Sequence, residues 1–183
     1  MSGVSLRIAV IGLSGSGKST CAAELAAYAR EHGLSCTRVP LARPLYELQR
    51  QVYAAAGVPL HEGAQDQVLM ENLAGHLRRL NPRTLADDFT ARLAATDTDM
   101  VLNDDLRDPH VDAPALRAAG FRILRITCDE EIRRKRLAER GDLTRADGST
   151  RGLDLITPDT VIDNSGDAAA YRAAIRAFVR SST

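Results

Sequence analysis

The sequence has no excess of charge of either sign, because 24 lysines and arginines balance 24 aspartates and glutamates over 183 residues. A balanced surface offers no general attraction for nucleic acid or for an anionic membrane, so neither is expected as a partner. No apolar run is long enough to span a bilayer, and we expect no secretory leader ahead of the first motif. The composition therefore favours a protein that acts on small molecules.

Cysteine and histidine are also few. Cys21, Cys36 and Cys128 are odd in number, far apart and without C-x-x-C spacing, so we expect reduced thiols in a cytoplasmic protein. The 4 histidines fit no metal-binding spacing. Because the chain shows no repeat and no linker, it is expected to fold as a single domain over residues 1–183. The oligomeric state stays open, with a homodimer as one expectation.

The most specific feature is GLSGSGKST, residues 12–20, which matches G-x-x-x-x-G-K-[ST] at every fixed position. Its glycines let successive backbone N–H groups point at one anion. An apolar, β-branched run precedes this P-loop and an Ala- and Leu-rich helical pattern follows it, which is the order that phosphate binding requires. Lys18 is expected to reach the β- and γ-phosphates, and the Ser19 hydroxyl to bind Mg²⁺. The motif alone leaves open a kinase, a GTPase switch, a motor or a regulatory ATPase.

Strand and helix patterns alternate along the rest of the chain. This alternation predicts an α/β fold of three layers (α/β/α), with a five-stranded parallel sheet and ligands at the carboxyl ends of its strands. After the first strand, the expected strands are 34–42, 99–104, 121–127 and 159–164, and the expected helices are 43–56, 64–80, 83–95, 112–119, 129–140 and 168–179. The helices at about 43–96 form an insert between two strands, and the loop at about 141–157 is too long for a bare connection.

Charged residues on the acceptor side of the sheet suggest an anionic acceptor. Asp104, Asp105 and Arg107 follow the third strand. An aspartate there could orient Mg²⁺, with Asp104 as the metal candidate, or accept a proton from the attacking oxygen, and Arg107 could hold an anion. Arg78 and Arg79 end a helix of the insert, where the helix dipole also favours them. Arginines around one cleft suit a doubly charged phosphate monoester. Solvated surface charge is the alternative for each.

A basic segment follows the fourth strand. Arg136 and Arg140 stand four residues apart as like charges, an arrangement that is mildly destabilising unless an anion or a partner lies between them. They lead into the glycine-rich loop 141–157, which has the composition of a lid over phosphates. A kinase needs such a lid because water would otherwise accept the γ-phosphate. A disordered surface loop is the alternative.

Taken together, these segments resemble a known family. The small P-loop kinases of nucleotides and of dephospho-coenzyme A are similar to this chain in GLSGSGKST, in RLAER before the lid, and in DTVIDNSG. The phage-type deoxynucleoside monophosphate kinases are more particularly similar in QVLMENLAGHLRRLNPRTLADDFTARL and in MVLNDDLRDPHVDAPALRAAGFRILRI. The resemblance covers about residues 6–180. Two departures, Tyr46 in place of a basic residue and the lack of a His-x-Ser-Glu stretch in the lid, concern the acceptor's base and sugar.

The resemblance implies transfer of the γ-phosphoryl group of ATP, with Mg²⁺, to a (deoxy)nucleoside monophosphate. The residues that it implies for ATP and Mg²⁺ are Gly12, Ser14, Gly15, Ser16, Gly17, Lys18, Ser19 and Thr20, with Arg140 at the phosphates and Asn164, Ser165 and Gly166 beside the adenine. The acceptor residues are Arg78, Arg79, Asp104, Asp105 and Arg107, with Asp105 near the reacting oxygen and with Arg136 and Arg140 clamping the transferring phosphate. The alternatives are a dephospho-coenzyme A kinase, another small-metabolite kinase, or a non-catalytic ATP-binding regulator.

Overall fold

The strands of the computed structural model, which describes residues 6–139 and 152–182, form one parallel sheet. Its order is β2-β3-β1-β4-β5, and the described strands are β1 (Leu6–Ile11), β2 (Cys36–Arg38), β3 (Met100–Asn103), β4 (Arg122–Thr127) and β5 (Thr160–Asp163). The register pairs Ile8 with Leu102 and with Arg122, so β1 lies in the middle of the sheet. The predicted three-layer α/β fold is confirmed.

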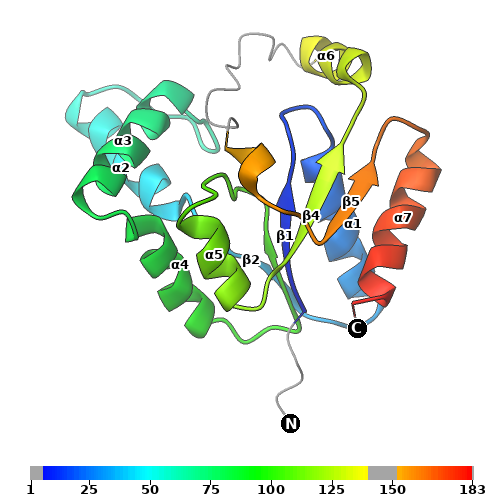
Figure 1. Ribbon diagram of the computed structural model, residues 1–183. Helices are drawn as coiled ribbons and strands as arrows, with labels where there is room; N and C mark the ends of the chain where they lie inside the picture. The colour runs from blue at the N-terminus through cyan, green and yellow to red at the C-terminus, as the bar shows by residue number, and fades with distance from the viewer. Residues whose placement is uncertain (1–5, 140–151, 183) are drawn as a thin grey trace.

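Helices cover both faces of this sheet (Figure 1). The described helices are α1 (Lys18–Glu31), α2 (Arg43–Ala55), α3 (Gln67–Leu80), α4 (Thr84–Ala94), α5 (Asp112–Ala118), α6 (Glu130–Glu139) and α7 (Ala168–Arg180), with a short 3₁₀ helix at Leu153–Leu155. Helices α1 and α7 pack together on one face, and α4 and α5 pack together on the other. Helix α6 lies beyond the carboxyl ends of the strands, above the P-loop that joins β1 to α1.

Alternation along the central strand explains the two covered faces. Ile8 and Val10 belong to the apolar cluster of α1 and α7, whereas Ala9 and Ile11 belong to the cluster of α4 and α5. All four side chains are buried. Because a parallel strand covered on both faces cannot expose a polar side, the near-continuous apolar run of β1 follows from its position. The carboxyl ends of the strands therefore meet at one edge, where their loops are free to bind ligands.

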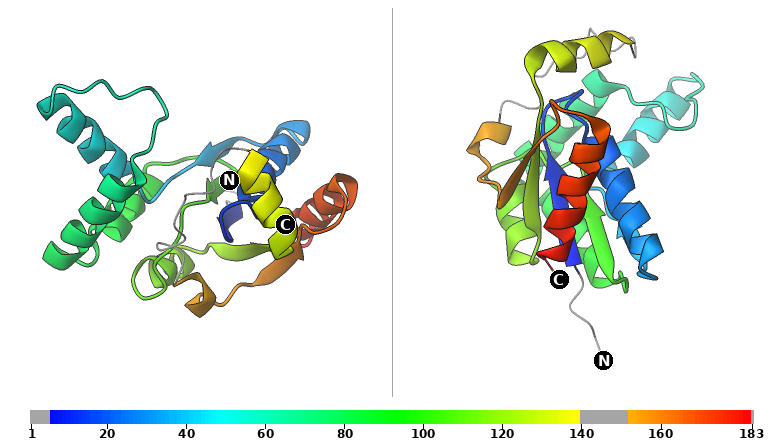
Figure 2. Two further views of the ribbon diagram at one scale, coloured as in Figure 1. Left: turned by 90° about the horizontal axis from the view of Figure 1, so that it is seen from above. Right: turned by 90° about the vertical axis from the view of Figure 1, so that its right-hand side faces the viewer.

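The helical segment between β2 and β3 has two parts. Helices α2 and α3 pack on each other and reach out beyond the sheet, as Figure 2 shows. The Asp66 side chain caps α3 by accepting a hydrogen bond from the Leu69 N–H at 3.0 Å. Helix α4 instead covers the sheet, with Leu85 and Phe89 in the core. Of the predicted insert at 43–96, only the first two helices thus stand outside the layers.

The structure shortens some predicted elements. The second strand was expected at 34–42, but β2 ends at Arg38. Pro40 follows, which has no N–H for a ladder, and the chain turns at Leu41 and Ala42. Residues 140–151, which hold most of the predicted lid and Arg140, lie outside the described residues. No helix among residues 6–139 and 152–182 has the length and apolar character of a membrane span.

Candidate active site

The P-loop follows the central strand and has the geometry of an anion site. Gly15 and Gly17 have φ angles of 81° and 109°, in the left-handed region that favours glycine. A Cβ at Gly17 would also lie 2.2 Å from the Asn164 Nδ2 atom, so only glycine fits there. Helix α1 begins at Lys18 and adds the partial positive charge of its N-terminus. The loop is shaped for the phosphates expected from the sequence.

The polar side chains of the loop are placed to meet such a ligand. The Lys18 Nζ atom donates hydrogen bonds to the carbonyls of Gly12 at 2.7 Å and Leu13 at 3.0 Å, so the ammonium lies at the loop. Ser19 and Thr20 are exposed in the first turn of α1. The Ser16 Oγ atom is buried without a hydrogen-bond partner. No cluster of three or more metal-binding side chains occurs among the described residues. The exposed Ser19 hydroxyl is suited to contact an ion whose other ligands are phosphates and water.

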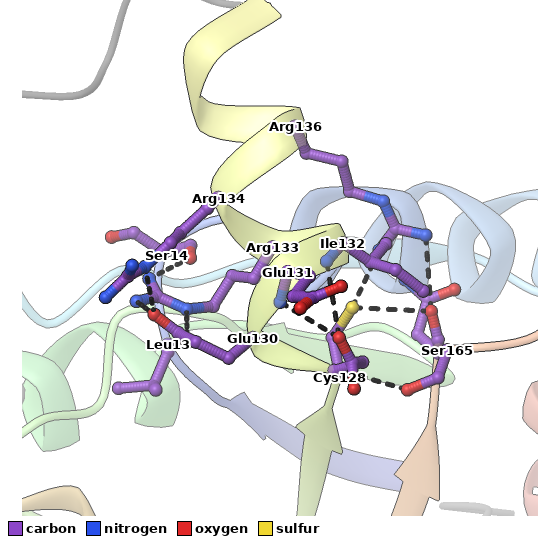
Figure 3. Close-up of polar contacts among 12 residues, drawn as sticks. Leu13, Ser14, Cys128, Glu130, Glu131, Ile132, Arg133, Arg134, Arg136 and Ser165 are labelled. Carbon is purple, nitrogen blue, oxygen red and sulfur yellow. Dashed lines mark hydrogen bonds and ion pairs between the residues drawn. The ribbon is translucent and has the colours of Figure 1, made fainter.

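Helix α6 packs on the P-loop through an arginine that the sequence analysis did not identify (Figure 3). The buried Arg133 donates to the Ser14 carbonyl at 2.9 Å and forms two hydrogen bonds with Glu130, at 2.7 and 2.9 Å. Glu130 also accepts from Arg134 at 2.9 Å. The hydrogen bond from Arg133, with that from Arg134, lowers the pKa of Glu130 to about 2 despite its partial desolvation. The three-residue spacing of Glu130 and Arg133 could have suggested this pair, but not its contact with the loop.

Arg136 points to the other side of α6. Its Nη1 atom lies 3.3 Å from the Cys128 Sγ atom, and its Nη2 atom donates to the Asn164 carbonyl at 3.2 Å. Figure 3 shows Arg136 directed toward Cys128 and Ser165, while Arg133 is directed toward Ser14. In this structure Arg136 therefore joins the ends of β4 and β5 instead of covering the P-loop. The predicted clamp of Arg136 with Arg140 stays a prediction, because Arg140 lies outside the described residues.

The three residues after β5 that were expected beside an adenine make different contacts. The buried Asn164 donates from Nδ2 to the Ser16 carbonyl at 2.8 Å, so it supports the P-loop from behind. The Ser165 hydroxyl donates to Asp163 at 2.8 Å and accepts from the Asp129 N–H at 2.8 Å. Gly166 has open space where a Cβ would stand. Of these three residues, Gly166 is exposed, Ser165 is partly exposed and Asn164 is buried, and their place beside an adenine stays a prediction.

A second site, the insert cavity, lies between α2, α3 and the segment after β3, with a volume of about 430 Å³. Its lining residues are Leu41, Ala42, Leu45, Tyr46, Gln65, Gln67, Met70, Glu71, Ala74, Gly75, Arg78, Leu85, Asp105, Arg107, Asp108, Pro109, Asp112 and Gly152. The size is within the range of small-molecule sites. Two of the predicted acceptor arginines, Arg78 and Arg107, share this cavity. Arg79 is exposed and does not line it.

Arg78 is held by a buried carboxylate. Its Nη2 atom lies 2.7 Å from Asp112 Oδ2, and only 2% of the Asp112 side chain is exposed. Burial raises the pKa of Asp112, and the Arg78 charge opposes this shift. The Arg78 Nε and Asp112 Oδ1 atoms are buried without hydrogen-bond partners. Asp112 fixes the guanidinium at the cavity wall, and the sequence analysis did not identify this role.

Asp105 also lines the cavity, but its carboxylate is engaged with the main chain. Its two oxygens accept hydrogen bonds from the N–H groups of Leu41 and Ala42, both at 2.9 Å, and Asn103 donates to it at 2.7 Å. Burial raises the pKa of Asp105 in spite of these donors. The residue expected near the reacting oxygen thus anchors the start of α2.

Asp104, the other candidate aspartate, is paired across the sheet. It accepts a hydrogen bond from Arg38 Nε at 2.6 Å, where β2 and β3 end side by side. Arg38 was not singled out from the sequence, because its partner is 66 residues away. The structure therefore places Asp104 at the predicted edge of the sheet, in an ion pair.

No known protein-family model matches the sequence, and no curated protein matches it. Solved structures match over nearly the whole chain. A sugar kinase from Janibacter sp. HTCC2649 is similar with a TM-score of 0.55 and 20% identity, over 96% of this chain and 95% of that one. A shikimate kinase from Acinetobacter baumannii has a TM-score of 0.52 at 13% identity, over 97% and 93%. An APS kinase from Mycobacterium tuberculosis has a TM-score of 0.50 at 19% identity, over 96% and 99%. These likenesses show that the chain has the fold of P-loop kinases.

Proposed function

We propose that this protein is an ATP-dependent kinase that transfers the γ-phosphoryl group to a (deoxy)nucleoside 5′-monophosphate and forms the diphosphate. The observation that carries the proposal is that Arg78 and Arg107 line one cavity at the sheet edge that also holds the P-loop. The P-loop follows β1 and Arg107 follows β3, and these strands are paired. Donor and acceptor sites are therefore neighbours.

The acidic side chains of the insert cavity do not argue against an anionic acceptor, because each of them accepts at least one hydrogen bond from an N–H donor. The exposed Glu71 accepts from the Gln67 side chain at 3.0 Å, and Asp112 is engaged through one of its two oxygens. Asp105 accepts from two backbone N–H groups, and Asp112 accepts from Arg78. Asp108 accepts from the N–H groups of Val111 at 2.6 Å and His110 at 3.0 Å. Burial alone would raise the pKa of Asp108, but these backbone donors outweigh it and lower the pKa. The carboxylates are thus used in building the walls, and the guanidinium groups are suited to a phosphate.

The rest of the cavity suits a base and a sugar. The apolar and aromatic side chains that line it include Leu45, Tyr46, Met70 and Leu85. The Gln65 amide donates to the Tyr46 hydroxyl at 3.0 Å, and the amide and phenol supply both donors and acceptors. Such a mixture of apolar surface and a few placed polar groups is typical of small-molecule sites. The structural neighbours are kinases of sugar, shikimate and APS, so they support phosphoryl transfer but differ in the acceptor.

The chain's own residues would have distinct tasks in the reaction. ATP with Mg²⁺ supplies the γ-phosphoryl group when bound. The P-loop N–H groups and the Lys18 ammonium would hold the phosphates and stabilise the charge that develops as the group moves. The Ser19 hydroxyl would contact the metal ion. Arg78 and Arg107 would orient the acceptor so that one of its phosphate oxygens attacks the γ-phosphorus while the bond to the ADP oxygen breaks.

Three arginine variants test the acceptor site. Arg107→Ala should lower kcat/KM for the acceptor by roughly ten- to a hundredfold, because a charge-assisted contact with phosphate is lost. Arg107→Lys should recover only part of this, since an ammonium cannot present the planar fork. Arg79→Ala is the matched control, because Arg79 is exposed outside the cavity. The measurement is steady-state kinetics with the concentrations of ATP and acceptor varied separately. A change in the kinetic parameters for ATP alone, or an equal loss of kcat/KM in Arg79→Ala, would contradict the proposal.

A further inference from the structure

The carbonyl groups of the P-loop determine where its N–H groups point. No cis peptide bond occurs among the described residues. In a trans peptide the C=O of one residue and the N–H of the next point in opposite directions. A donor that binds a loop carbonyl from behind therefore turns the following N–H toward the front, where an anion would lie. The residues that supply such donors set the geometry of the phosphate site without touching the phosphates.

Asn164 supplies one of these donors from the end of β5. Its Nδ2 atom binds the Ser16 carbonyl at 2.8 Å, which directs the Gly17 N–H away from Asn164. Asn164 is itself held, because its N–H donates to the Thr127 carbonyl at 2.8 Å and its carbonyl accepts from Arg136 at 3.2 Å. Only 6% of Asn164 is exposed. This is a rigid support and not an open ligand contact.

Two further donors act on the same loop from other elements. The Tyr171 hydroxyl, on α7, donates to the Gly17 carbonyl at 3.0 Å. The same carbonyl accepts from the Cys21 N–H of α1 at 2.9 Å, and the two donors together direct the Lys18 N–H forward. Arg133, on α6, donates to the Ser14 carbonyl at 2.9 Å and does the same for the Gly15 N–H. Tyr171 is 3% exposed. Donors from three separate parts of the chain thus bind carbonyls of the loop.

We infer that Asn164 and Tyr171 are positioning residues that preorganise the P-loop for the phosphate chain of ATP. The inference rests on the proposed function only in taking a nucleotide as the ligand of the loop. It assigns Asn164 to the phosphates, through the Ser16 carbonyl, and not to the adenine. Because these hydrogen bonds already hold the P-loop in its binding geometry, the loop need not become ordered when the phosphates bind. Loss of one of these hydrogen bonds should therefore weaken phosphate binding directly.

The test compares two ligands by calorimetry on the full chain, MgATP and inorganic tripolyphosphate with Mg²⁺. Tyr171→Phe and Asn164→Ala should each weaken both ligands equally, by roughly three- to tenfold, because each variant loses one hydrogen bond that orients the loop. The KM for the acceptor should not change. Tyr28→Phe is the matched control: Tyr28 is a buried tyrosine about three turns along α1 from the loop, and its ring stacks on His32.

The outcomes separate this inference from the proposed function. Unchanged affinity for both ligands in Tyr171→Phe and Asn164→Ala would overturn the inference and leave the kinase proposal intact. A loss confined to MgATP in Asn164→Ala would also overturn it, because Asn164 would then act on the adenine. If the wild-type chain binds both ligands but phosphorylates no acceptor, the proposed function fails, and the equal loss in the variants still supports the inference.

Discussion

The Lys18 ammonium is the group on which we expect phosphate binding to depend most. The chain has 24 basic residues, but only Lys18 and Lys135 are lysines. A compact point charge can follow a phosphoryl group in a way that a planar guanidinium cannot. Its Nζ atom donates to the Gly12 and Leu13 carbonyls, which keeps it at the loop. The side chain is partly exposed, so the core does not depend on it.

Lys18→Ala should therefore remove activity and keep the fold. We expect kcat/KM to fall by at least about a hundredfold, the typical effect of losing one donor to transition-state charge. The circular dichroism spectrum and the thermal midpoint should stay close to those of the wild type. Kinetics and melting curves on the same preparation provide the check. Loss of the folded spectrum together with activity would mean that Lys18 is structural.

At the scale of elements, Asp105 fixes where the outlying helices start. Asp105→Ala leaves the Leu41 and Ala42 N–H groups without their partner. We expect the free energy of unfolding to fall by about 1–2 kcal/mol, since relief of the buried charge offsets part of the lost hydrogen bonding. Urea unfolding measures this. Asp87→Ala is the control, because Asp87 is exposed in a surface pair with Arg83, and its effect should stay within about 0.5 kcal/mol. Equal effects of the two variants would count against the anchoring role.

Helix α6 offers a prediction on pH. The folded-state pKa of Glu130 is lowered to about 2 from its ordinary value of 4.5, mainly by Arg133. A lowered carboxyl pKa stabilises the folded state fully above pH 4.5, and this stabilisation is lost as the pH falls toward 2. Glu130→Gln should thus lower the thermal midpoint at pH 7, by no more than about 2 °C for such an exposed group. The difference from wild type should shrink in melts below pH 4.5. A difference that stays constant would exclude this ionic contribution.

The sequence predicts those elements that depend on local patterns. The P-loop is a contiguous motif, and the strands and helices follow from apolar periodicity, so both are confirmed within a few residues. Contacts between segments that are distant in the sequence cannot be predicted in this way. Tyr171 binds Gly17 from 154 residues away, and Arg78 meets Asp112 from 34 residues away. No local pattern encodes such pairs, which is why Tyr171, Arg133 and Asp112 were not predicted and Asn164 was assigned to an adenine.

At the scale of the whole molecule, the sheet brings the P-loop and the insert cavity to the same edge. The loops after β1 and β3 emerge side by side, and α2 and α3 reach out to wall the insert cavity beside them. Arg78 and Arg107 come from α3 and from the loop after β3, so only the fold places them in one cavity. This juxtaposition is the physical basis for assigning the acceptor as a phosphate.

The central claim is that the γ-phosphoryl group goes to another phosphate. The most direct measurement is the rate of ADP release by the wild-type chain with each common nucleoside 5′-monophosphate and its matched nucleoside. A 5′-monophosphate should exceed its nucleoside in kcat/KM by roughly a hundredfold or more, because two charge-assisted contacts are left unmade without the phosphate. Dephospho-coenzyme A and free sugars in the same series should be poor acceptors. Equal turnover of a nucleoside and its monophosphate, or transfer only to dephospho-coenzyme A or a sugar, would contradict the account.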